Sequence, residues 1–200
     1  MIAESAGRIW DYMSGGGLVM APLAGISLIM WVLIINRIMF FRRLYRRNMN
    51  RKTAGEFVKT DRLPDPRQFT GAVALLVTDF IENRSRLPEV DSYILDETVI
   101  SLTTAMDRHL SAIGVLAKTA PLLGLLGTVL GMITTFDIIS FYGTGNAKAM
   151  AGGISEALIT TQTGLLVAIP GLYMSNFLKR RSQALKQRVA SVGIYLKRHI

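Results

Sequence analysis

The chain has 200 residues, of which 50% are hydrophobic and 18% charged, and it contains no cysteine. The lack of cysteine excludes disulfides, thiolate metal sites and cysteine nucleophiles, and the two histidines have no metal-ligand spacing to another ligand. The net charge of +9 is concentrated in acid-free basic clusters at Arg42–Lys52 and Lys179–Arg198. Each cluster directly follows an apolar run, as cytoplasmic flanks of membrane helices do. This distribution favours one unit embedded in a lipid bilayer over a nucleic-acid-binding protein.

Two elements are predicted at the start of the chain. Residues 1–17 mix apolar and polar side chains and end in three glycines, which predicts an amphipathic helix on the periplasmic side of the membrane. Residues 18–41 form the first predicted transmembrane helix. Its core, Leu18–Ile35, covers about 27 Å at 1.5 Å per residue, enough to span once the flanks are counted. We expect Arg37 to mark the cytoplasmic boundary and to extend towards the headgroups.

Residues 42–111 are predicted to form a cytoplasmic helical region. The apolar stripe of Phe69, Val73, Leu76 and Phe80 predicts a helix from about Arg67 to Arg84. Pro88 then opens a new helix, since proline is favourable in a first turn. No breaker follows it before Pro121. We therefore expect a single helix from about Glu89 to Ile139, whose first half stands in the cytoplasm.

Residues 112–140 and 152–178 form the second and third predicted transmembrane helices, joined by a periplasmic loop at 141–151. Residues 179–200 continue as a basic cytoplasmic helix with Leu185, Val189 and Leu196 on its apolar side. The predicted fold is all-α: an integral membrane protein with three transmembrane helices, two of them extending into a cytoplasmic helical bundle. The N-terminus is expected in the periplasm and the C-terminus in the cytoplasm.

The second predicted transmembrane helix has an unusual face. At 100° per residue, small and hydroxyl-bearing residues share one narrow stripe, and leucine and valine cover the rest. Such a stripe is typical of a membrane helix that packs closely on another helix or lines a narrow polar path. The residues of this stripe are Ala117, Pro121, Gly124, Thr128, Gly131 and Thr135.

The third predicted transmembrane helix contains one acid, Glu156. Thr160, Thr163, Val167 and Pro170 lie within about 40° of it on a helical wheel, with Gly153, Gly164 and Gly171 on a strip beside them. A carboxylate inside an apolar helix is costly unless it faces a partner or water, so Glu156 is a candidate functional residue. The alternative is an acid near a helix start, where the helix dipole favours negative charge.

These two stretches resemble the ExbB/TolQ/MotA family of proton-channel proteins, and ExbB most closely. TAPLLGLLGTVLGMITTF is similar to the second membrane helix of that family, and GGISEALITTQTGLLVAIP to its third. The resemblance implies that Thr128, Glu156 and Thr161 lie on a proton path. Thr160 and Thr135 join the predicted path because they share helix faces with Glu156 and Thr128. Gln162 departs from the small or apolar residue usual at its position.

The resemblance also implies the assembly and its role. ExbB-type proteins form a homopentamer around an ExbD-type single-span partner in the bacterial inner membrane, and use the proton motive force to energise a TonB-type protein and outer-membrane transport. One alternative is a TolQ-type subunit of the Tol motor; another is a passive membrane scaffold. In a scaffold, glycines would serve only for helix packing: Gly124, Gly127, Gly131, Gly164 and Gly171.

No enzyme constellation is present in the sequence. There is no nucleophile with a nearby base, no phosphate-binding loop and no cluster of metal ligands, so we expect neither enzymatic activity nor a cofactor. A single carboxylate among threonine hydroxyls suits proton relay, because both groups can accept and donate hydrogen bonds.

Two vertical registers of the second and third membrane helices are compatible with the sequence. The resemblance sets Thr128 level with Thr161, which also sets Lys118 level with Gly171 and Lys179 level with Leu110. Counting residues inward from the basic ends instead sets Thr128 near Ala168 and leaves Glu156 near the outer surface. We favour the first register.

Overall fold

The computed structural model describes residues 12–198, and within them every regular element is helical. Most of the amphipathic helix predicted over residues 1–17 therefore lies outside the described residues. The described chain divides into two compact units. The first comprises residues up to Ile34 together with Ala112–Ser175, and the second comprises Ile35–Ser111 with the residues from Asn176 onwards.

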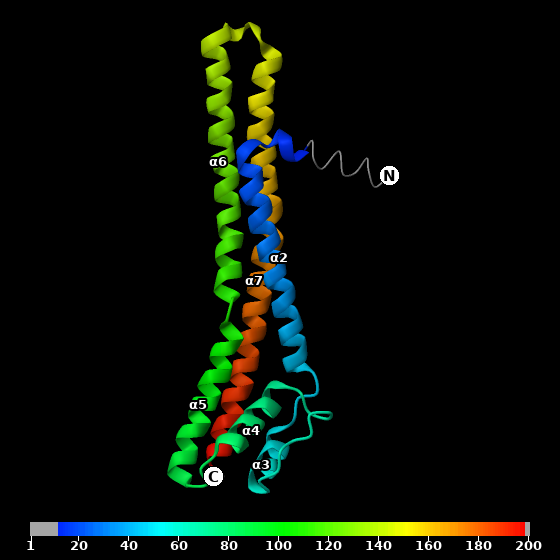
Figure 1. The fold of residues 1–200 in the computed structure, drawn as a ribbon, viewed down its shortest axis with the longest axis vertical. Coiled ribbons are helices and arrows are strands. Elements are labelled where there is room, and N and C mark those ends of the chain that lie inside the picture. Colours follow the sequence, from blue (N-terminus) through cyan, green and yellow to red (C-terminus); the bar gives the residue numbers. More distant parts are fainter. Residues whose placement is uncertain (1–11, 199–200) are drawn as a thin grey trace. The chain divides into compact units, whose positions relative to one another are not determined.

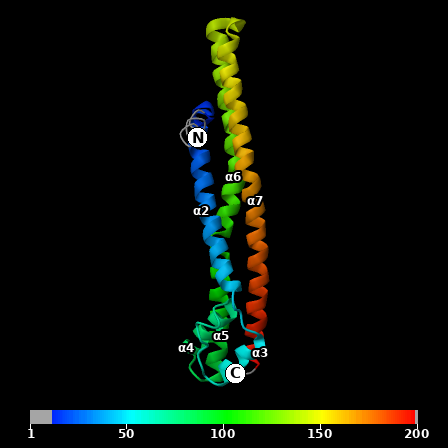
Figure 2. The same ribbon diagram turned by 90° about the vertical axis from the view of Figure 1, so that its right-hand side faces the viewer.

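The first unit is a helical hairpin with a third helix beside it. The hairpin arms are α6 (Leu110–Tyr142) and α7 (Ala147–Lys197), joined by the short 3-10 turn η2 (Gly143–Gly145). Another 3-10 turn, η1 (Gly17–Val19), leads into α2 (Met20–Tyr45). Figures 1 and 2 show the two arms running antiparallel side by side, with the first half of α2 along α7.

The hairpin buries its small residues and exposes its large ones. Buried positions recur every three or four residues: Ala117, Ala120, Gly124, Gly127, Gly131 and Thr135 in α6, and Gly153, Ala157, Thr160, Gly164, Ala168 and Gly171 in α7. Exposed positions include Leu122, Leu125, Val129, Ile133, Leu158, Leu165, Leu166 and Ile169. A soluble helix pair does the reverse. Helix pairs in a lipid bilayer expose apolar side chains outwards and bring their backbones into close contact inside.

Three helical stretches are long and apolar enough to cross a membrane. They are Gly17–Tyr45, Pro88–Gly145 and Ala147–Lys197 in the described chain. The prediction of an all-α membrane protein with three transmembrane helices is therefore confirmed.

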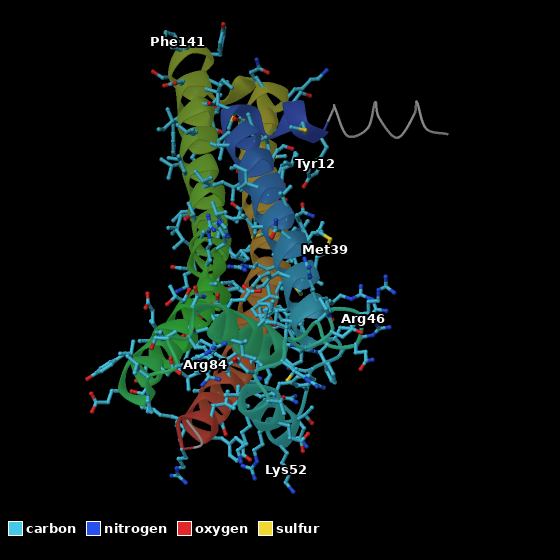
Figure 3. All side chains as sticks on the ribbon, turned by 60° about the horizontal axis from the view of Figure 1, so that its bottom comes forward. Tyr12, Met39, Arg46, Lys52, Arg84 and Phe141 are labelled. Atoms are coloured by element: carbon cyan, nitrogen blue, oxygen red, sulfur yellow. The ribbon has the colours of Figure 1, made fainter. Side chains whose placement is uncertain are left out.

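The second unit gathers the remaining helices with the ends of the long ones. It contains α3 (Arg51–Lys59), α4 (Ala72–Asn83) and α5 (Pro88–Asp107), together with the last turns of α2 and the second part of α7. Figure 3 marks Arg46 just after α2 and Lys52 in α3. Its buried side chains include the three predicted for the C-terminal helix, Leu185, Val189 and Leu196, and among the others are Leu76, Phe80, Leu95 and Met106.

A buried carboxylate joins the loop after α4 to the first turn of α5. Asp91 is only 1% exposed. Its Oδ1 accepts hydrogen bonds from the backbone N–H groups of Ser85, at 2.7 Å, and Arg86, at 3.1 Å, and Arg84 Nε donates to its Oδ2 at 3.3 Å. A carboxylate in the first turn of α5 also interacts favourably with the helix dipole. The prediction that this helix starts at Pro88 is confirmed.

The helix expected from about Arg67 begins later than predicted. The N–H groups of Gln68 and Phe69 both bond to the carbonyl of Asp65 at 3.0 Å, which closes a separate turn. Helix α4 starts only at Ala72, where Asn48 Oδ1 accepts from Val73 N at 3.0 Å. The capping group comes from a distant part of the chain, so local sequence could not place this start. Helix α3 was not predicted at all.

The single helix predicted from about Glu89 to Ile139 is interrupted. Helix α5 ends at Asp107 and α6 begins at Leu110. Arg108 is extended, with ψ 133°, and His109 has φ 65°. A left-handed conformation is costly for a residue with a side chain, so it must be held by its surroundings.

Arg37 helps to stabilise this break between α5 and α6. Its side chain does not extend towards the headgroups, so that prediction was wrong. It is 4% exposed. Its guanidinium donates to the carbonyl oxygens of Ala105, at 3.1 Å, and Arg108, and lies 4.8 Å from the ring centre of Phe40. The last carbonyls of a helix have no partner within that helix, and a cation there also suits the helix dipole. Arg37 thus caps the C-terminus of α5.

Candidate functional site

The register of α6 against α7 follows from the contacts of the glycines. An ideal Cβ at Gly124 would lie 3.2 Å from Thr161 Cα and 3.4 Å from Gly164 Cα, and one at Gly171 would lie 3.0 Å from Ala117 Cβ. Thr128, one turn from Gly124, is therefore within about a turn of the level of Thr161. This confirms the first register.

Two further observations agree with that register. Ala168 packs with Ala120 and Leu23 in one buried cluster, so the alternative that set Thr128 near Ala168 is wrong. In the second unit, Leu110 and Lys179 line the same small cavity, as the first register predicts.

Close backbone contact defines the seam between α6 and α7. A Cβ at Gly131 would lie 2.6 Å from the carbonyl oxygen of Gly153, and one at Gly164 would lie 2.8 Å from that of Ala120. At Gly127 the obstacle is different, because all three nearest atoms belong to the side chain of Thr160. The predicted small-residue stripe thus lies in the seam at Ala117, Gly124, Gly131 and Thr135, while Pro121 and Thr128 are half-buried at its edge.

Threonine hydroxyls line this seam. Thr160 is fully buried and donates to the carbonyl oxygens of Glu156 and Ala157, at 3.0 and 2.9 Å. Thr135 is buried and donates to Gly131 O at 2.9 Å. Thr161 donates to Ala157 O at 3.1 Å and to Gly124 O of the facing helix at 3.4 Å, and Thr128 donates to Leu125 O at 2.6 Å. With its proton on a carbonyl, each hydroxyl oxygen keeps lone pairs that can accept a hydrogen bond.

Glu156 lies one turn before Thr160 and is half-buried. Its carboxylate packs against Gly17 of η1, so closely that an ideal Cβ there would overlap Oε1 and lie 2.6 Å from Cδ. Among the described residues, the Glu156 side chain has no hydrogen-bond or ion-pair partner. Thr160 thus bonds to the backbone of Glu156 and Thr161 bonds to the facing helix, whereas the Glu156 carboxylate contacts Gly17. Thr128 lies at the edge of the seam on α6, and Thr135 lies beside Gly153 towards the η2 turn.

Three features of this unit were missed by the sequence analysis. Tyr12 and Thr163 share a hydrogen bond between their hydroxyls at 3.0 Å, and Gly17 contacts Glu156. For the contact between Gly17 and Glu156, the run of three glycines was the only local signal in the sequence. Asp137, an exposed second acid in α6, was not weighed, although a carboxylate in an apolar helix was signal enough. Gln162, the departure from the family pattern, is exposed.

The carboxylate and hydroxyls present here can exchange protons and form hydrogen bonds. The described residues contain no group of three or more side chains able to hold a metal ion. One half-buried carboxylate and several hydroxyls between close-packed membrane helices define a class: polytopic membrane proteins that carry polar groups between their helices.

Comparison with known proteins gives the family. A model of the MotA/TolQ/ExbB proton channel family matches residues 67–191. An ExbB-like protein of Synechocystis, ExbB-like 3, is 32% identical over 174 residues, which are 80% of each chain, and ExbB-like 1 of the same organism is 30% identical over 93% of this chain and 76% of its own. The biopolymer transport protein ExbB of Aquifex aeolicus is 44% identical over 80 residues, 40% of this chain and 54% of that protein. The chain belongs to the MotA/TolQ/ExbB proton channel family.

Proposed function

We propose that this chain is the proton-conducting subunit of an ExbB–ExbD-type motor in the bacterial inner membrane. The observation that carries the proposal is the placement of Glu156, half-buried in a membrane helix and one turn from the buried hydroxyl of Thr160. A carboxylate in such a place is expected to exchange protons, because it adds nothing to helix packing that a smaller apolar residue would not.

The path runs along the threonines. Glu156 takes up and releases the proton, and Thr160, Thr161 and Thr128 position water or accept hydrogen bonds along the seam, with Thr135 towards the outer end. Movement of one proton down the membrane potential releases about 2.3 kcal/mol per 100 mV. That free energy would drive a TonB-type protein and, through it, outer-membrane transport.

The assembly we propose is a homopentamer around an ExbD-type single-span partner. Its support is the identity with proteins named ExbB and the exposed leucine-rich faces of α6 and α7, which leave apolar surface for neighbouring helices and lipid. A TolQ-type motor would use the same geometry. Co-purification with an ExbD-type partner, and not with a TolR-type one, is the expected discriminating result.

The test is proton uptake into vesicles that contain the complex. Glu156→Gln keeps the size and removes the titratable group, so uptake should fall by at least tenfold, a conservative figure for loss of an essential proton carrier. Glu97→Gln is the matched control, because it makes the same change at an exposed carboxylate of α5, and its uptake should equal that of the wild type. A Glu156→Gln complex with wild-type uptake would favour the passive scaffold instead.

A further inference from the structure

The segment before α2 lies along one face of α7 at three successive levels. The Tyr12 hydroxyl bonds to Thr163 Oγ1 at 3.0 Å. Ideal Cβ atoms at Gly15 and Gly16 would lie 3.4 and 3.3 Å from Ile159 side-chain atoms, and one at Gly17 would meet the Glu156 carboxylate. Thr163, Ile159 and Glu156 are spaced by four and three residues, so they share one helix face. Tyr12 is labelled in Figure 3 beside the start of the same segment.

Gly17 is the residue that fits this arrangement. Its φ of +62° is one that residues with side chains rarely adopt, and any Cβ would occupy the space of the carboxylate. Two independent requirements, a left-handed backbone and zero side-chain volume, therefore meet at one position. Of the two described glycines with positive φ, Gly143 has only the first requirement, because nothing lies within 4 Å of its Cβ position.

We propose that Gly17 is a positioning residue for the proton carrier: the turn at residues 15–17 is a seat that fixes where the Glu156 carboxylate lies. This inference rests on the proposed role of Glu156. The seat covers the carboxylate on the α2 side and restricts it to the remaining side. The chain's own N-terminal segment thus belongs to the proton path, although it lies more than 130 residues from Glu156 in sequence.

The main test compares two alanine variants of the complex. Gly17→Ala adds backbone strain and a clash with the carboxylate, whereas Gly143→Ala adds only the strain. Displacement of a reacting group by about 1 Å can cost up to about a hundredfold in rate, so proton uptake should fall by at least tenfold in Gly17→Ala and by less than twofold in Gly143→Ala. Native mass spectrometry should show the same oligomer for both.

Rescue separates positioning from general disruption. Glu156→Asp shortens the side chain by one methylene and makes room for the added methyl group. The double variant Gly17→Ala with Glu156→Asp should recover uptake at least threefold over Gly17→Ala alone. The proposal would be overturned if Gly17→Ala showed the same proton uptake as Gly143→Ala. It would also be overturned if the double variant took up protons no faster than Gly17→Ala alone.

A second measurement does not depend on the Gly17→Ala variant assembling. Tyr12→Phe removes the hydrogen bond to Thr163 without adding atoms, and it should loosen the seat. Labelling of Glu156 by dicyclohexylcarbodiimide, followed by mass spectrometry, should become about threefold faster or more, the change expected when a weak hydrogen bond is lost. Labelling at the wild-type rate would contradict the seat. If Glu156→Gln alone keeps full proton uptake, the proposed function is wrong. If Glu156→Gln loses uptake but Gly17→Ala keeps it, only this inference is wrong.

Discussion

The glycines of the α6–α7 seam are not equivalent, because their neighbours differ. At Gly131 and Gly164 the nearest atoms to an added Cβ are backbone atoms of the facing helix. At Gly127 they are side-chain atoms of Thr160 alone. A backbone neighbour cannot move without shifting a whole helix, whereas a side chain can be exchanged.

This difference gives a prediction at the residue scale. Gly131→Ala and Gly164→Ala should lower the thermal stability of the detergent-solubilised protein, by about 1–3 kcal/mol as expected for overpacking. Gly25→Ala in α2, with nothing within 4 Å of its Cβ position, is the matched control and should not destabilise the protein, because alanine favours a helix over glycine. A second variant pair sharpens the result: Gly127→Ala should be rescued by Thr160→Gly, and no single exchange in α7 should rescue Gly131→Ala. Equal melting temperatures for Gly164→Ala and Gly25→Ala would contradict the seam.

At the scale of elements, the break between α5 and α6 depends on Arg37. The guanidinium binds the carbonyls of Ala105 and Arg108, which the interruption leaves without helical partners. Both bonds come from one guanidinium nitrogen, Nη2, and lysine carries the same charge but lacks the planar guanidinium that also lies over the Phe40 ring.

Replacing Arg37 should therefore destabilise the junction of α5 and α6. Arg37→Met keeps the apolar stem and removes the donors, and it should cost about 1.5–3 kcal/mol, the range for hydrogen bonds to a charged group. Arg37→Lys should recover only part of this loss. Arg180→Met is the control, since Arg180 is an exposed arginine. Chemical denaturation in detergent measures the differences, and equal midpoints for Arg37→Met and Arg180→Met would show that the contact carries no stability.

Elements that follow from local pattern were predictable, and those set by distant contacts were not. The span of α2, the start of α5 at Pro88 and the apolar side of the C-terminal helix could be read from periodicity and from proline. The start of α4 needs Asn48, the end of α5 needs Arg37, and the surroundings of Glu156 need Gly17. Each of these depends on a partner at least 25 residues away, which no local window of sequence contains.

For the whole molecule, the predicted orientation can be tested directly. The chain has no cysteine, so a single introduced cysteine reports its own position. Gly145→Cys lies in the η2 turn with open space around it, and Arg180→Cys lies in the basic part of α7. We expect a membrane-impermeant maleimide to label Gly145→Cys in spheroplasts and Arg180→Cys only after lysis, because basic flanks stay in the cytoplasm. The reverse pattern would invert the topology.

The fit of Gly127 around Thr160 has an evolutionary consequence. Since an atom added at one position must be removed at the other, substitutions at the two positions should occur together among relatives: a larger residue at 127 should accompany a smaller one at 160. The same reasoning couples position 17 to position 156. Relatives with a side chain at position 17 should have a shorter acid, or no acid, at position 156. Gly131 and Gly164 face backbone, so no compensating substitution exists, and these two positions should vary least of all.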